Sequence, residues 1–392
     1  MWAGRWPCAI VAGMSDTTHD QPLNLVILCP DQWRADYLGC YGHPTIGTRH
    51  IDRLAAEGVR FDHAYCAAPL CGPSRVSFVT SLRFSEHGRR NYGSTIDYAA
   101  VPNLISTLKA AGYRTGMFGK NHCFHHHQLG EIWDELHEFC LGNYDGHPKY
   151  ERAHSAFELE ADHPYNVTGL LTDEAVDFMD RAPRERPFVC WVNWQDPHPA
   201  FCCPPPYSTM FDPADIELPA SWRGDDDPTK PRKLNNWRHN SRAIDASEAD
   251  VRAAIAKYMG QCRYVDDQVG KVMAHLERTG RLEDTLVLFF SDHGELLGDF
   301  GVFHKIPTFH ECLARIPAIV RYPRGHRDGR PAPLVFDGLV EEVDFSPTLL
   351  DALGVERPAS MVGQSWHAAI MAGDTTGRET VLCEAGLQQP TE

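Results

Sequence analysis

Residues Leu23–Cys29 have the sequence LNLVILC, which is the clearest indication of the fold class. It is a short, unbroken apolar run that Pro30 ends, as expected for a strand buried on both faces of a parallel sheet. Two later runs have the same character, Phe188–Trp194 and Thr285–Phe290, and a weaker one spans Tyr113–Phe118. Together these runs predict a mostly parallel central sheet.

Amphipathic helices are predicted between these strands. The clearest spans about 251–279, where apolar residues recur at alternating spacings of four and three. Ser247 and Asp250 predict a capping box at its start. Shorter helices are predicted over 103–111 and 346–354. Because strands alternate with helices, we expect an α/β fold with helices on both faces of the sheet.

The chain divides into one large domain and two short terminal parts. We predict a single domain over residues 21–355, preceded by a disordered extension over 1–20. The charged, proline-bearing stretch Trp222–Arg242 has no periodicity and is interpreted as an insertion loop, either solvated or placed over a site. Glu379–Glu384 (ETVLCE) is interpreted as the first strand of a truncated or naturally short C-terminal subdomain over 356–392.

Composition excludes several classes of protein. The 392 residues include 53 acidic and 37 basic side chains, which gives a net charge of -16 that repels nucleic acid. No apolar run reaches the roughly 18 to 20 residues of a membrane span. The 13 cysteines are an odd number and have no regular spacing. We therefore expect the protein to lie in the reducing cytoplasm, with the periplasm as the alternative.

Polar residues gather where the predicted strands end. The carboxyl ends of parallel strands meet at one edge of a sheet, and ligands bind beyond that edge. Shortly after the four apolar runs, the sequence has six polar residues: Asp31, Lys120, Asp196, His198, Asp292 and His293. We therefore expect a polar site at this edge.

The segment Cys71–Arg75 (CGPSR) precedes an apolar stretch, 76–82, that is compatible with a helix. A helix that begins at Cys71 would direct free N–H groups and a positive dipole end at an anion. Arg75, four residues later, would return to the same face. An anion pocket around one cysteine is one interpretation, and a buried structural thiol is the other.

This segment matches C-x-P-S-R, the signature of the type I sulfatases in the alkaline phosphatase superfamily, in which the cysteine is oxidised to formylglycine. Further stretches resemble blocks of the same family in the same order, and together they extend from about Leu23 to Gly354. These stretches are Asp31–Arg34, Gly119–His122, Asp196–Pro199, Ser291–Gly294 and Lys305.

The resemblance implies an alkaline-phosphatase-like fold and hydrolysis of a small or medium organic sulfate ester by an aldehyde hydrate at Cys71. It also implies one divalent cation, bound by Asp31, Cys71, Asp292 and either His293 or Gln32. Many relatives have aspartate at the position of Gln32 and asparagine at that of His293. We expect Ca²⁺ first, with Mg²⁺ or Mn²⁺ as alternatives.

The remaining site residues are also implied by the resemblance. Lys120 and His122 resemble the pair that contacts the hydrated aldehyde and sulfate, and Lys305 resembles the second lysine that grips sulfate. His198 is the candidate proton donor to the leaving oxygen, because imidazole titrates near neutral pH. Asn91 is a further candidate for the pocket wall.

Two other functions stay open. The Asp31–Gln32 pair and the stretch Asp196–Tyr207 (DPHPAFCCPPPY) resemble phosphonate monoester hydrolases, which hydrolyse phosphate or phosphonate esters with a similar site. A relative in which Cys71 stays a thiol would only bind an anion. The resemblance implies a formylglycine-generating enzyme as maturation partner, and a truncated subdomain would leave apolar surface suited to a homo-oligomer.

Overall fold

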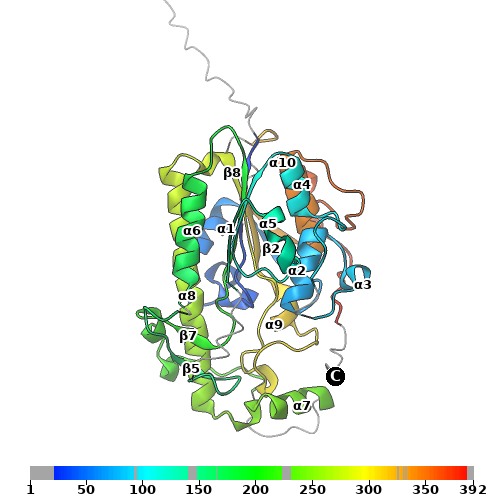
Figure 1. The fold of residues 1–392 in the computed structure, drawn as a ribbon. Coiled ribbons are helices and arrows are strands. Elements are labelled where there is room, and N and C mark those ends of the chain that lie inside the picture. Colours follow the sequence, from blue (N-terminus) through cyan, green and yellow to red (C-terminus); the bar gives the residue numbers. More distant parts are fainter. Residues whose placement is uncertain are drawn as a thin grey trace, which may run out of the picture.

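The computed structural model describes residues 22–91, 95–139, 148–164, 166–222, 231–324, 326–329, 331 and 333–385. The extension predicted over 1–20 lies outside these residues. A twisted nine-stranded sheet crosses the middle of the molecule (Figure 1). From one edge to the other, eight of its strands are β11 (Leu334–Glu341), β2 (Val59–Tyr65), β10 (Ala318–Arg321), β8 (Thr285–Phe290), β1 (Asn24–Leu28), β6 (Phe188–Asn193), β3 (Arg114–Gly119) and β4 (Glu135–Glu138).

The four predicted strands are neighbours at the centre of this sheet. β1 pairs in parallel with β8 on one side and with β6 on the other, and β6 pairs in parallel with β3. Every residue of β1, β6 and β8 is buried, as their unbroken apolar sequences predict. The expected mostly parallel sheet is therefore confirmed.

Antiparallel pairing is confined to one half of the sheet. β10 runs antiparallel to both β8 and β2, and the two-residue strand β9 (Arg315–Ile316) also pairs antiparallel with β2. A separate two-stranded sheet joins β5 (Ala156–Glu158) to β7 (Phe201–Cys203).

Helices cover both faces of the large sheet (Figure 1). One face carries α1 (Arg49–Glu57), α6 (Thr168–Asp180) and α8 (Glu248–Arg278), which share a core with alternate sheet residues such as Val26 and Val287. The other carries α2 (Cys71–Thr80), α4 (Leu104–Ala110) and α10 (Phe345–Leu353), which pack on Leu25 and Leu286. The remaining α-helices are α3 (Phe84–His87), α5 (Leu129–Ile132), α7 (Arg232–Asn240), α9 (Glu311–Ala314) and α11 (His367–Ala372).

The predicted helices form close to their expected limits. Ser247 caps α8, and its side chain accepts from the Asp250 N–H at 3.2 Å in the predicted capping box. None of the helices among the described residues combines the length and the apolar character that crossing a bilayer demands.

Two predictions were wrong. Residues 223–230 of the predicted insertion loop Trp222–Arg242 lie outside the described residues. The described remainder contains the helix α7, because Leu234 and Arg238, one turn apart, are buried against the rest of the molecule. The predicted strand Glu379–Glu384 does not form. That segment is held by contacts from single residues instead, such as the Leu382 N–H, which donates to Glu341 Oε1 at 3.0 Å.

Gly119, the last residue of β3, yields a test of this architecture. Its φ is +114°, and a Cβ there would collide with the carbonyl oxygen of Asn193 on β6. We expect Gly119→Ala to lower the free energy of unfolding by more than about 3 kcal/mol, since strain and collision add. Urea denaturation provides the measurement.

Gly112→Ala is the matched control. Gly112 has a φ of +91° but open space around its Cβ position. This variant should lose about 1 kcal/mol from backbone strain alone. Equal losses in the two variants would contradict the collision between β3 and β6.

Candidate active site

The order of the central strands brings the predicted site residues together. Asp292 follows β8, Asp31 follows β1, and Lys120 follows β3, so all three lie at the carboxyl edge of the sheet. Cys71 is the first residue of α2, and its side chain is completely buried against them. The expected convergence at this edge is present.

Arg75 links the two aspartates. Its Nε donates to Asp292 Oδ2 at 2.9 Å, and its Nη2 donates to Asp31 Oδ2 at 3.2 Å. Nη1 donates to Asn193 Oδ1 at 2.7 Å. The side chains of Arg75, Asp31 and Asp292 are 0% exposed. Since buried charges are tolerated only when paired, Arg75 stabilises a site with two carboxylates.

The Cys71 thiol lies among charged groups. Its Sγ is 3.1 Å from His293 Nε2, 3.5 Å from Asp31 Oδ1 and 3.8 Å from Lys120 Nζ. Burial and Asp31 raise the pKa of this thiol, but the nearby cationic side chains outweigh them and hold the pKa below its usual value. The surroundings therefore favour negative charge at the Cys71 side chain.

Asp31 is held ionised. Burial raises the pKa of its carboxyl group, yet surrounding cations bring the pKa well below the usual range. Lys120 contributes most of this effect, because its Nζ lies 2.7 Å from Asp31 Oδ2. A permanently charged carboxylate suits a cation ligand.

Four side chains form a group that could hold a metal ion: Asp31, Cys71, Asp292 and His293, whose ligand atoms all lie within 4.8 Å of one another. His293 Nδ1 lies 2.8 Å from the Gly294 carbonyl oxygen, which can only accept, so in its neutral form the ring has its lone pair on Nε2, toward Cys71. Carboxylate oxygens with an imidazole fit a divalent cation.

Gln32 lies beside this group but its side chain has other partners. Its Nε2 donates to Glu295, and its Oε1 accepts from Lys305 Nζ at 2.6 Å. Its backbone N–H donates to Asp292 Oδ1 at 3.0 Å. Of the two residues expected as alternative fourth ligands, the structure therefore directs His293 into the group and ties the Gln32 amide to Lys305.

Lys305 and His198 form a second pair. Lys305 Nζ lies 2.5 Å from His198 Nε2, while His198 Nδ1 lies 2.6 Å from the Pro199 carbonyl oxygen. Burial, and then Lys305 and Lys120, lower the pKa of His198 well below its usual value. In the absence of substrate the His198 ring is therefore neutral near pH 7. Its role as proton donor to the leaving oxygen stays a prediction.

The two remaining predicted residues, His122 and Asn91, lie in different surroundings from each other. His122 adopts a φ of 51°, and burial together with Lys120 and Arg75 lowers its pKa to about 2, so it is a neutral neighbour of the site. Asn91 lies on the exposed surface beyond α3, unlike the buried residues above. Its role in the pocket wall stays a prediction.

Three further residues of the site were not selected from the sequence. Asn193, at the end of β6, accepts from Arg75. Glu295 accepts from Gln32, and burial raises its pKa. Glu342 accepts from the Ser74 hydroxyl at 2.6 Å, and burial raises its pKa well above the usual value. A polar residue at the end of an apolar strand was a usable signal for Asn193, but the two glutamates lacked one.

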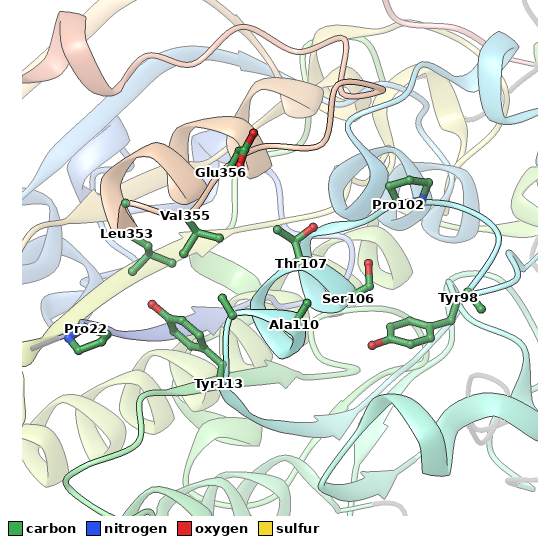
Figure 2. A pocket seen from close by; sticks show the side chains of 13 residues that line it. Pro22, Tyr98, Pro102, Ser106, Thr107, Ala110, Tyr113, Leu353, Val355 and Glu356 are labelled. Carbon is green, nitrogen blue, oxygen red and sulfur yellow. The ribbon is translucent and has the colours of Figure 1, made fainter.

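A wide hollow elsewhere on the molecule is lined by α4, Tyr113 and the end of α10 (Figure 2). Ser106, Tyr113, Leu353 and Glu356 are among its lining residues. None of the described residues that line it was predicted for the site. It is therefore separate from the candidate active site.

Comparison with protein families identifies the family of this chain. The family model for sulfatases matches residues 23–355. The chain belongs to the sulfatase family. This result confirms the predicted family, the alkaline-phosphatase-like fold class and the enzyme class, a sulfuric ester hydrolase.

Individual relatives agree with this assignment. An arylsulfatase from Clostridium perfringens is 28% identical, over 91% of this chain and 80% of that protein. An N-acetylglucosamine-6-O-sulfatase from Bacteroides thetaiotaomicron is 27% identical, over 87% of this chain and 70% of that protein. The solved phosphonate monoester hydrolase SpPMH from Silicibacter pomeroyi superposes with a TM-score of 0.74 and 26% identity, over 90% of this chain and 77% of that one.

Arg75→Lys tests the link between the aspartates. One ammonium cannot replace the three directed N–H contacts of the guanidinium, so we expect the free energy of unfolding to fall by about 3 kcal/mol. Arg49→Lys, at a side chain that is 71% exposed, should cost less than about 0.5 kcal/mol. Similar urea midpoints for both variants would refute the structural role assigned to Arg75.

Proposed function

We propose that this sulfatase-family protein hydrolyses a small or medium organic sulfate ester to an alcohol or phenol and sulfate, with residue 71 as the nucleophile. One observation carries the proposal. The Cys71 side chain is fully buried at the first residue of α2, within contact distance of Asp31, Lys120 and His293. That setting stabilises a nucleophile beside positive charge.

The proposed nucleophile is the hydrate of a formylglycine made from Cys71. In that form, hydroxyl oxygens would occupy the region that the Cys71 Sγ occupies here. One hydroxyl would form the new O–S bond as the S–OR bond breaks. Loss of the proton from the other hydroxyl would then re-form the aldehyde as the C–O bond to sulfate breaks, and addition of water would restore the hydrate. A formylglycine-generating enzyme is the proposed maturation partner.

We further propose that Asp31, Asp292, His293 and residue 71 hold one divalent cation. The four ligand atoms are close enough to share an ion. Ca²⁺ is the first choice because two carboxylates contribute hard oxygen ligands, and Mg²⁺ and Mn²⁺ are the alternatives. A bound ion would lower the pKa of the attacking hydroxyl and offset negative charge.

Cationic side chains would bind the sulfate. Lys120 and Lys305 are 3% and 5% exposed. Lys120 lies close to Cys71, and Lys305 lies close to Gln32. Two ammonium groups suit the dispersed charge of sulfate oxygens. The His198–Lys305 pair is the proposed source of the proton for the leaving oxygen, and His198 Nε2 lies 2.5 Å from Lys305 Nζ.

A narrow cavity beside Lys305 is the proposed place for the organic part of the ester. Its lining is mainly apolar and includes Leu70, next to Cys71, and Ile306, next to Lys305. Phe84 and Trp237 form further walls. Trp237 belongs to α7. Lys233, on the same helix, anchors α7 because its Nζ donates to the Pro307 carbonyl oxygen at 2.8 Å. The apolar residues of this lining match the chemistry of an apolar leaving group.

Hydrolysis of a phosphate or phosphonate ester is the second candidate function. The resemblance of the Asp31–Gln32 pair and the 26% identity to the phosphonate monoester hydrolase SpPMH both support it. A cytoplasmic location is proposed from cysteine usage alone.

Substrate comparison and Cys71→Ala test the main proposal. Enzyme co-produced with a formylglycine-generating partner should hydrolyse aryl and alkyl sulfates faster than a phosphate diester or a phosphonate ester. Cys71→Ala should reduce turnover of every ester by at least about 10³-fold, because the nucleophile is lost. Cys66→Ala, at another buried cysteine, should stay active. Full turnover by Cys71→Ala, or preference for the phosphorus esters, would decide against sulfate hydrolysis through residue 71.

His198→Gln tests the proton supply to the leaving oxygen. An alkoxide needs a proton but 4-nitrophenolate does not, so kcat/KM should fall by about 10²-fold or more for an alkyl sulfate and by less than about tenfold for 4-nitrophenyl sulfate. His137→Gln, at a half-exposed histidine on β4, should change neither rate. Equal losses on both esters would remove His198 from this role.

A further inference from the structure

A second group of metal-ligating side chains lies outside the candidate active site. His326 and Asp328 belong to the loop after β10, and His367 is the first residue of α11. Their ligand atoms all lie within 4.8 Å of one another. His367 Nε2 is 3.0 Å from Asp328 Oδ2, and His326 Nδ1 is 3.9 Å from the same oxygen.

The neighbours of His326 direct its lone pair into this group. Its Nε2 lies 2.7 Å from the carbonyl oxygen of Ala352, which can only accept a hydrogen bond. The ring proton of the neutral imidazole is therefore on Nε2, and Nδ1 keeps the lone pair. The Asp328 backbone N–H donates to Nδ1 at 3.2 Å, a contact that a metal ion would replace. Ring nitrogens that ligate metals generally have such a carbonyl partner on the opposite nitrogen.

His367 is fixed in a similar way. Its Nδ1 lies 3.1 Å from the Tyr322 hydroxyl, and the two rings stack with centroids 5.7 Å apart. Tyr322 is 1% exposed and belongs to the apolar core, so the position of the His367 ring is set by packing. Nε2 then faces Asp328 across the shared space.

Burial and charge complete the arrangement. The two histidines are 4% and 8% exposed, whereas the Asp328 side chain is 46% exposed and leaves the group open to water on one side. Arg327 Nε donates to Asp328 Oδ2 at 3.3 Å. A carboxylate ligand commonly keeps an outer hydrogen-bond partner of this kind.

We propose that His326, Asp328 and His367 form a site for a divalent transition-metal ion, with Zn²⁺ as the best fit, separate from the ion of the candidate active site. Two imidazole nitrogens and one carboxylate oxygen are a ligand set that Zn²⁺ prefers, and water completes the coordination. Hard cations such as Ca²⁺ bind oxygen-rich groups instead. The bound ion joins the loop after β10 to α11.

Zinc titration of metal-stripped protein tests the site. Isothermal calorimetry and metal analysis after dialysis should give wild type one more equivalent of Zn²⁺ than His367→Gln. Asp328→Asn, at a half-exposed side chain, should weaken that equivalent at least tenfold while preserving the fold. Zn²⁺ should also raise the melting temperature of wild type more than that of Asp328→Asn.

Two further variants separate this site from other ligands. Asp292→Asn disrupts the active-site group and should retain the equivalent assigned here. His63→Gln, at a half-exposed histidine that faces Asp337, should bind as wild type does. If His367→Gln and Asp328→Asn bind as much Zn²⁺ as wild type with unchanged affinity, or if only Asp292→Asn loses zinc, the proposed site is wrong. If His367→Gln does not fold, Asp328→Asn alone decides.

Discussion

The ion pairs of Arg75 with Asp31 and Asp292 are the constraint on which the site depends. Two buried carboxylates repel each other and lose hydration, and a guanidinium that donates to both at 2.9 and 3.2 Å offsets these costs. Arg75 lies one turn after Cys71 on the same helix. The contacts that hold the aspartates therefore also fix the start of α2, and with it the proposed nucleophile.

Charge balance follows from the same arrangement. Arg75 pairs with Asp31 and with Asp292, Lys120 also pairs with Asp31, and burial raises the pKa of Glu295. Each buried aspartate therefore has a cationic partner before any metal binds. Cationic side chains at such a site favour an anionic ester and the negative charge that develops on its oxygens. The neutral ring of His198 belongs to this balance, because an imidazolium beside Lys305 would add uncompensated charge.

Much of this arrangement could be predicted from the sequence. Continuous apolar runs such as Leu23–Cys29 form strands that are buried on both faces, and their parallel pairing places Asp31 and Asp292 at one edge. Contacts between distant segments could not be predicted. The helix α7 forms because Leu234 packs against residues that are remote in the sequence. The segment Glu379–Glu384 has no neighbouring strand to pair with among the described residues. The side chain of Gln32 is hydrogen-bonded to Glu295, 263 positions away. The local sequence does not indicate which distant residues will be in contact.

The proposed reaction and the proposed substrate selection rest on different parts of the fold. Asp31, Lys120 and Asp292 lie at the ends of central strands, where pairing on both sides fixes the backbone. The cavity for the organic group is walled instead by short helices and loops, with Phe84 from α3 and Trp237 from α7. Side chains on such peripheral segments can change shape or size without disturbing the buried ion pairs. A sheet edge of this kind can therefore keep one reaction while the surrounding walls accept different alcohols.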